Sequence, residues 1–244
     1  MNPATVAREI DRLLRATGTP ERAAGEKAYL KSDLEFYGVT VPAMRKAVLA
    51  VWRDSGPLDH DEVVAVVEAL WATGIHECRM AVVELLTLAL PELGEGDVPL
   101  VERLLRESRT WALVDGLAAT VVGGIDAMAG IGPTLERWGR DPDFWIRRSA
   151  LLAHLQGLRS GDGEIGRFLR LAEGMLDEKE FFIRKAIGWC LRELGKRRPD
   201  AVVEWLAPRT DRASGVTMRE AVKPLSDAEA RRLMGAYRDR RAAG

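Results

Sequence analysis

Three groups of residues in this 244-residue chain have types and spacings that could do chemistry. Trp111 precedes Asp115 by four residues, which places an indole and a carboxylate on one face of a helix. Arg148 lies in the middle of an otherwise apolar helical face, and Phe182 and Trp189 share one sector of another helix. A fixed carboxylate beside the electron-rich faces of indole rings favours a positively charged ligand or transition state.

The sector that contains Phe182 and Trp189 is basic. It also holds Lys185, Arg192 and Lys196, whereas the apolar face of this helix is complete without the two aromatics. Cationic side chains of this kind can hold phosphates without reading a base sequence. The alternative is a solvated surface on which the tryptophan is incidental.

Asp115 is the only charged residue in a predicted helix from about Thr110 to Val122 that is apolar almost all round. A carboxylate in such surroundings is costly unless it has a partner. Asp115 is therefore either a functional group or a structural one that caps a backbone or pairs with an arginine.

The elements that position these residues read as a helical repeat. Helical segments alternate with short Gly/Pro/Asp-rich stops, and no strand alternation is visible. The tetrad Arg-x-Ala-(Val/Leu/Ile) recurs at intervals of 34, 69, 36 and 35 residues, beginning at Arg45, Arg79, Arg148, Arg184 and Arg219. One unit lacks the tetrad, and its position falls near residue 114, beside Asp115.

Units of about 35 residues with two helices each are typical of a HEAT-like or armadillo-like α-helical solenoid. The sequence thus predicts an all-α fold with a single curved domain over residues 1–244 and a concave cleft. Equivalent helices of successive units lie side by side in such a fold, so the three groups should converge in that cleft. The repeat arginines could equally form a structural ladder between units.

Composition limits the other functions. The net charge is −1, but residues 1–140 contain 15 basic and 21 acidic residues, and residues 141–244 contain 21 and 16. Two distant cysteines and three scattered histidines predict no disulfide framework and no metal site. We see no signal peptide and expect no apolar run of the roughly 18 residues that span a membrane. A cytoplasmic protein with no membrane partner is the expectation.

Four segments resemble signature segments of the AlkD family, which are HEAT-like-repeat DNA glycosylases that remove alkylated purines. They are "KAYLKSDLEFYGVTVPAMRKAV", "WALVD", "FWIRRSALL" and "EFFIRKAIGWCLRE". The resemblance extends from about Tyr29 to beyond Arg192. The nearly neutral net charge departs from the basic character expected of this family, which bears on affinity for bulk DNA more than on the chemistry.

The resemblance implies roles for individual residues. Asp115 matches the catalytic carboxylate, Trp111 and Trp189 match the tryptophans that line the cleft, and Arg148 matches an arginine that helps to hold DNA. The expected DNA-binding residues are Tyr29, Arg45, Phe182, Lys185 and Arg192.

The resemblance also implies a reaction. A monomeric enzyme would hydrolyse the N-glycosidic bond of 3-methyladenine, 7-methylguanine or a bulkier adduct in double-stranded DNA, without a metal or a cofactor. The competing expectation is an inactive helical-repeat module that binds DNA or a protein on its concave face.

Overall fold

The computed structural model describes residues 1–242, with side chains through residue 239. Within this range all regular secondary structure is helical, and the extended chain forms one isolated bridge, between Glu35 and Ile75. The chain divides into two compact units, Met1–Leu117 and the residues from Ala118 onward. The single domain predicted for residues 1–244 stays a prediction.

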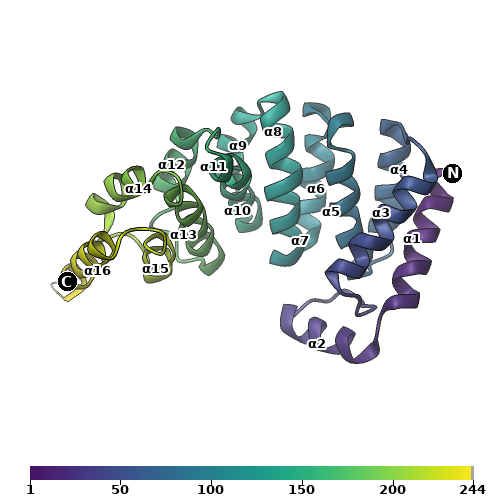
Figure 1. The fold of residues 1–244 in the computed structure, drawn as a ribbon, viewed down its shortest axis with the longest axis horizontal. Coiled ribbons are helices and arrows are strands. Elements are labelled where there is room, and N and C mark those ends of the chain that lie inside the picture. The colour runs from purple at the N-terminus through teal and green to yellow at the C-terminus, as the bar shows by residue number, and fades with distance from the viewer. Residues whose placement is uncertain (243–244) are drawn as a thin grey trace. The chain divides into compact units, whose positions relative to one another are not determined.

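In the first unit α1, α3, α4 and α5 pack against one another, and α5 and α6 both contact α7. Figure 1 shows α2 set apart at one end of this unit, and α2 buries none of its residues. The helices are α1 (Pro3–Thr17), α2 (Pro20–Leu30), α3 (Val41–Ser55), α4 (His60–Trp71), α5 (His76–Leu88), η1 (Leu90–Glu92), η2 (Glu95–Asp97), α6 (Val98–Ser108) and α7 (Trp111–Gly116).

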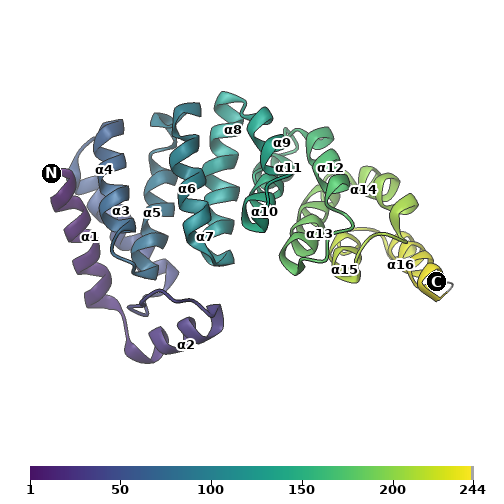
Figure 2. The ribbon, with the colours of Figure 1, turned by 180° about the vertical axis from the view of Figure 1, so that it is seen from behind.

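In the second unit α10, α13 and α15 follow one another as packed neighbours, as Figure 2 shows from behind. The elements are η3 (Leu117–Val122), α8 (Gly123–Ala129), α9 (Gly132–Trp138), α10 (Phe144–Leu152), α11 (Leu155–Ser160), α12 (Ile165–Gly174), α13 (Phe181–Gly195), α14 (Pro199–Leu206), η4 (Ala207–Arg209), α15 (Gly215–Ala221) and α16 (Asp227–Ala242). A Cβ on Gly188 of α13 would lie 2.8 Å from the Cβ of Glu220, so this glycine permits the close approach of α15.

The predicted stops between helices contain working N-caps. The side chains of Asn2, Thr19 and Thr40 each accept a hydrogen bond from a backbone N–H in the first turn of the helix that follows. Asp59 and Glu62 form a reciprocal capping box at the start of α4. These bonds satisfy donors that would otherwise lack partners, which is why the helices begin there.

The repeat prediction is confirmed within each of the two compact units. Arg45 lies on α3 and Arg79 on α5, and these two helices pack together. Arg148, Arg184 and Arg219 lie on α10, α13 and α15, which pack in that order. Equivalent helices of successive repeats are therefore neighbours within each compact unit, as a helical-repeat fold requires.

The helix of the repeat that lacks the Arg-x-Ala tetrad is longer than predicted. Helical backbone continues from Trp111 to Ala129, through the π-helical segment η3. By length and by its mean hydropathy of 1.5 this helix could cross a membrane, contrary to the expectation that no apolar run would be long enough. Half of its apolar window is buried inside the protein, as in a core helix.

Candidate active site

Trp111 and Asp115 lie on a partly covered strip of their helix. Their neighbours Leu113, Val114 and Leu117 are fully buried, whereas Trp111 and Asp115 are half-buried. The helix begins at Trp111 after the extended residue Thr110, and four residues make about one helical turn. The fold thus places the indole and the carboxylate on one accessible face, as the spacing predicted.

Gly116 explains how closely this helix approaches its neighbour α5. A Cβ at this position would lie 2.8 Å from Cγ1 of Val83. The absence of a side chain lets the turn that holds Asp115 pack directly on α5. The carboxylate is therefore mounted on a rigid element, which suits a preorganised electrostatic role.

Tyr29 is brought next to Trp111. Its ring meets the indole edge to face, with 6.1 Å between ring centroids and 89° between planes, and the tyrosine is 73% exposed. Both rings border a cavity of about 230 Å³ in the first unit. Arg45, on α3, has an exposed side chain that pairs with Glu84 at 3.1 Å. Exposed pairs of this kind contribute little and exchange readily, so the Arg45 guanidinium can take another anion.

Arg148 is buried in the second unit, with 2% of its surface exposed. Its guanidinium donates a hydrogen bond to the carbonyl oxygen of Phe182 and lies 5.7 Å from the centre of the Phe182 ring. These contacts bring two of the expected site residues together. They also match the structural alternative, in which a repeat arginine ties one unit to the next.

Phe182 is itself part of an aromatic cluster. Its ring centroid lies 4.8 Å from that of Trp145 and 6.2 Å from that of Phe144, in nearly parallel planes in the second case. Trp145 is buried, as expected of a packing residue. Phe182 remains half-buried, so part of its ring is accessible.

Trp189 is half-buried, and the guanidinium of Arg159 lies 5.9 Å from the centre of its ring. Its Nε1 is buried and has no hydrogen-bond partner among the described residues. Lys185 is exposed, whereas Arg192 donates to Glu220 and lies 3.6 Å from Glu193. Arg192 would have to release these carboxylates to hold a phosphate.

The structure thus divides the expected residues between the two units, with contacts of Tyr29 with Trp111 and of Arg148 with Phe182. Tyr29, Trp111 and Asp115 belong to the first unit together with Arg45. The second unit holds the set Arg148, Phe182, Lys185, Trp189 and Arg192. The convergence of both sets in one cleft stays a prediction, as do the individual roles.

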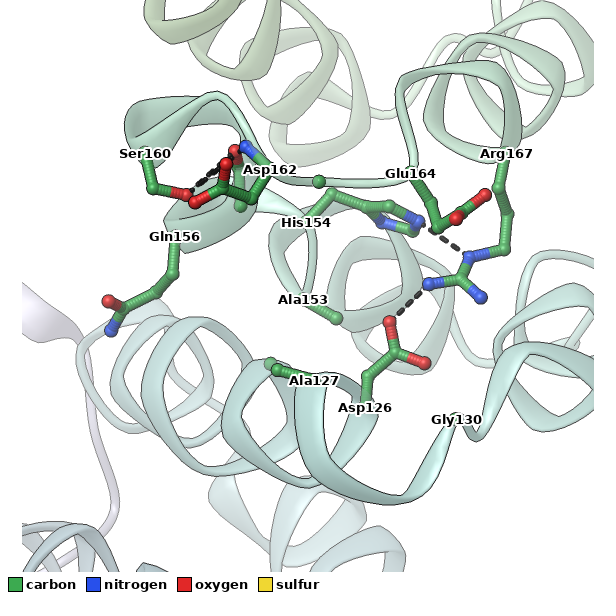
Figure 3. A pocket seen from close by; sticks show the side chains of 13 residues that line it. Asp126, Ala127, Gly130, Ala153, His154, Gln156, Ser160, Asp162, Glu164 and Arg167 are labelled. Atoms are coloured by element: carbon green, nitrogen blue, oxygen red, sulfur yellow. Dashed lines mark hydrogen bonds and ion pairs between the residues drawn. The ribbon is translucent and has the colours of Figure 1, made fainter.

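Sequence reasoning missed a chain of polar contacts in the second unit (Figure 3). Arg167 donates to Asp126 and, over 3.0 Å, to Nε2 of His154, on the wall of a cavity of about 600 Å³. Nδ1 of His154 donates to the carbonyl oxygen of Ala150, and burial lowers the pKa of this imidazole to about 4. The two side-chain partners of Arg167 lie 13 and 41 residues away, so no local spacing could have indicated them.

Comparisons with known proteins agree with this architecture. A solved structure described as a predicted DNA alkylation repair enzyme from Enterococcus faecalis superposes with a TM-score of 0.76 at 23% identity. The match covers 86% of this chain and 98% of that one, and at this identity it shows the fold. No curated protein matches the sequence. The profile of the DNA alkylation repair enzyme family matches residues 10–225, so the chain belongs to that family.

Proposed function

We propose that the protein is a monofunctional DNA glycosylase that excises positively charged alkylpurines, such as 3-methyladenine and 7-methylguanine, from duplex DNA. The observation that supports this proposal best is the strip formed by Trp111 and Asp115, a carboxylate and an indole on the accessible side of a buried helix. Membership of the DNA alkylation repair family supplies the substrate class.

The chemistry needs little more than a fixed negative charge. An N-alkylated purine already bears a positive charge and leaves without protonation by a general acid. As the glycosidic bond breaks, the sugar becomes oxocarbenium-like, and the carboxylate of Asp115 would stabilise this transition state more than the ground state. Two unit charges about 4 Å apart interact by roughly 4 kcal/mol at an effective dielectric of about 20. Because each 1.4 kcal/mol is about tenfold in rate, the carboxylate can supply about two to three decades.

The other groups of the site would bind and orient the damaged DNA and the attacking water. The face of Trp111 attracts the cationic nucleotide by roughly 0.5–2 kcal/mol. Asp115 could also orient or deprotonate the attacking water. Lys185 is an exposed cation that can contact a phosphate directly, whereas Arg148 would act through the position of Phe182.

The test is the mass analysis of bases released from methylated duplex DNA. We expect the wild-type chain to release 3-methyladenine or 7-methylguanine, and Asp115→Asn to release them about 100- to 1,000-fold more slowly. Asp54→Asn is the matched control, because it changes an exposed aspartate on α3 and should retain full activity. Equal rates for wild type and Asp115→Asn would refute the catalytic assignment.

One observation favours the alternative, a helical-repeat module that binds without catalysis. Burial of Arg148 and the ion pairs of Arg192 leave fewer cations available to phosphates than the sequence suggested. The slope of DNA affinity against salt concentration reports the number of phosphates that are neutralised. Binding that prefers methylated or abasic duplex supports the enzyme, whereas no binding at low salt supports a protein partner. The monomeric state and the cytoplasmic location stay predictions.

A further inference from the structure

The cavity beside Trp111 has a mostly apolar wall, in which Glu26, His76 and Glu77 are the acidic and basic residues. It lies in the first unit between α2, the chain before α3, and helices α5 and α7, and its volume is about 230 Å³. The rings of Tyr29 and Trp111 border it. The aliphatic and thioether side chains along it are those of Leu30, Val39, Val41, Met44, Met80 and Ala112.

His76 is an unusual member of this wall. It is 6% exposed, its ring stacks on Phe36 with 4.4 Å between centroids, and its Nδ1 is buried without a hydrogen-bond partner in the described chain. Burial lowers the pKa of this imidazole to about 4, so the ring is neutral at physiological pH. A buried polar atom without a partner is costly, and native proteins rarely keep one without a reason.

The neighbouring polar group is already satisfied. The carboxylate of Glu77 accepts hydrogen bonds from the backbone N–H groups of residues 37, 38 and 39, at 2.6 to 3.0 Å. Glu77 therefore holds the chain that closes the cavity, and it needs nothing from a ligand. His76, in contrast, borders the cavity and has a buried ring nitrogen without a hydrogen-bond partner in the described chain.

The size and composition of the cavity indicate a ring-sized apolar group. Pockets for drug-sized ligands have volumes of about 300–1,000 Å³, so this cavity suits a fragment of such a molecule. Met44 and Met80 are adaptable, because thioether side chains fill irregular gaps and contact aromatic rings favourably.

We propose that this cavity receives the substituent of the damaged base, and that His76 selects substituents that combine an aryl or branched apolar body with a hydrogen-bonding atom. The inference rests on the proposed function. Trp111 borders the cavity and shares its helix face with Asp115, so a lesion held at the carboxylate has its substituent within reach of the cavity. A methyl substituent leaves most of the space empty, whereas a benzyl group occupies a larger part of it.

The experiment compares three duplexes that each contain one 7-substituted guanine, with a methyl, a benzyl or a 4-hydroxybenzyl substituent. The rate of base release is measured for wild type and for His76→Phe, which retains a ring against Phe36 but has no ring nitrogen. We expect His76→Phe to lower the ratio of hydroxybenzyl to benzyl excision at least fivefold. The ratio of benzyl to methyl excision should change less than twofold.

A second pair of variants fills the cavity from two different helices. Met80→Trp acts from α5, and Val41→Trp acts from an exposed position at the start of α3. Either variant should lower the ratio of benzyl to methyl excision at least tenfold. Because each ratio is taken within one preparation, a partial loss of folded protein cancels.

The outcomes separate the two proposals. If the methyl lesion is released and neither ratio responds to the variants, the cavity assignment is overturned and the glycosylase proposal stands. If no lesion is released by the wild-type protein, both are overturned. Retention of hydroxybenzyl selectivity in His76→Phe, with loss of benzyl excision in Met80→Trp, overturns the role of His76.

Discussion

Glu77 provides a quantitative test of how the first unit is held together. Its side chain is 2% exposed, and its two oxygens accept three backbone N–H groups from a segment that lies about 40 residues earlier. Gly38 in that segment has φ +79, and a Cβ there would lie 2.2 Å from the carbonyl oxygen of Thr19. The segment cannot form helix here, so the carboxylate supplies the acceptors that a helix would have provided.

The expected cost of Glu77→Ala follows from these bonds. A hydrogen bond to a charged group contributes about 1.5–3 kcal/mol, so three bonds set an upper range of about 5–9 kcal/mol. The adjoining cavity of about 230 Å³ can admit water, which would satisfy part of the exposed N–H groups. We therefore expect a loss of about 3–5 kcal/mol in the free energy of unfolding, a large share of the about 5–15 kcal/mol of a typical domain.

Urea denaturation followed by circular dichroism measures this loss, with the slope against urea checked for constancy. Glu77→Gln should lose about half as much, since its amide oxygen can keep the bonds to residues 38 and 39 while its NH₂ group faces the N–H of Tyr37. Glu84→Gln on the same helix should lose less than about 0.5 kcal/mol, because its partner Arg45 is exposed. A loss below about 1 kcal/mol for Glu77→Ala would show that these bonds do not hold the segment.

Substitutions at three further places test other contacts. Arg167→Met should lower the free energy of unfolding by about 3–5 kcal/mol, because it leaves the Asp126 carboxylate buried without its cation. Adding Asp126→Asn to this variant should restore part of the loss, as measured by urea denaturation. Hydrogen bonds to Asp61 and Asp97 raise the pKa of His60 from 6.5 to about 9. The stabilisation of the folded protein by these bonds is therefore complete below about pH 6.5 and is lost as the pH rises through 9. His60→Asn should flatten that pH dependence, whose size stays below about 1 kcal/mol because the imidazole is 45% exposed. Gly188→Ala should cost about 1–3 kcal/mol in thermal unfolding, and an unchanged midpoint would contradict the close contact of α13 with α15.

The repeat could be predicted because it is written in local spacing. Each tetrad places one arginine and two apolar residues in the same order on a helix. The helices that contain the tetrad pack as neighbours within each compact unit. The N-caps were equally visible, since Thr19, Thr40 and Asp59 stand directly before their helices. Periodicity and capping depend on residues a few positions apart, and sequence reports such distances directly.

What could not be predicted depends on contacts between distant segments. The π-helical turn over Leu117–Val122 has no local cue, because its residues suit an α-helix equally well. The orphan nitrogen of His76 and the acceptors of Glu77 depend on a loop that lies about 40 residues away. The sequence shows the three histidines only as scattered residues, although two of the three are buried.

The repeat arginines show how one sequence position serves several purposes. Arg79 lies over the ring of Trp71 and donates to the carbonyl of Glu107 at 3.0 Å. Arg148 and Arg184 likewise donate to backbone carbonyls, those of Phe182 and Glu178.

These guanidiniums reach across the chain to main-chain oxygens, which accept charge-assisted hydrogen bonds from them. The helix that contains Asp115 lacks the tetrad, and there a half-buried carboxylate stands near the position where the other units have the arginine. The repeat therefore supports a structural role for the arginine position, whereas the glycosylase proposal gives the carboxylate at this position a role toward a cationic ligand.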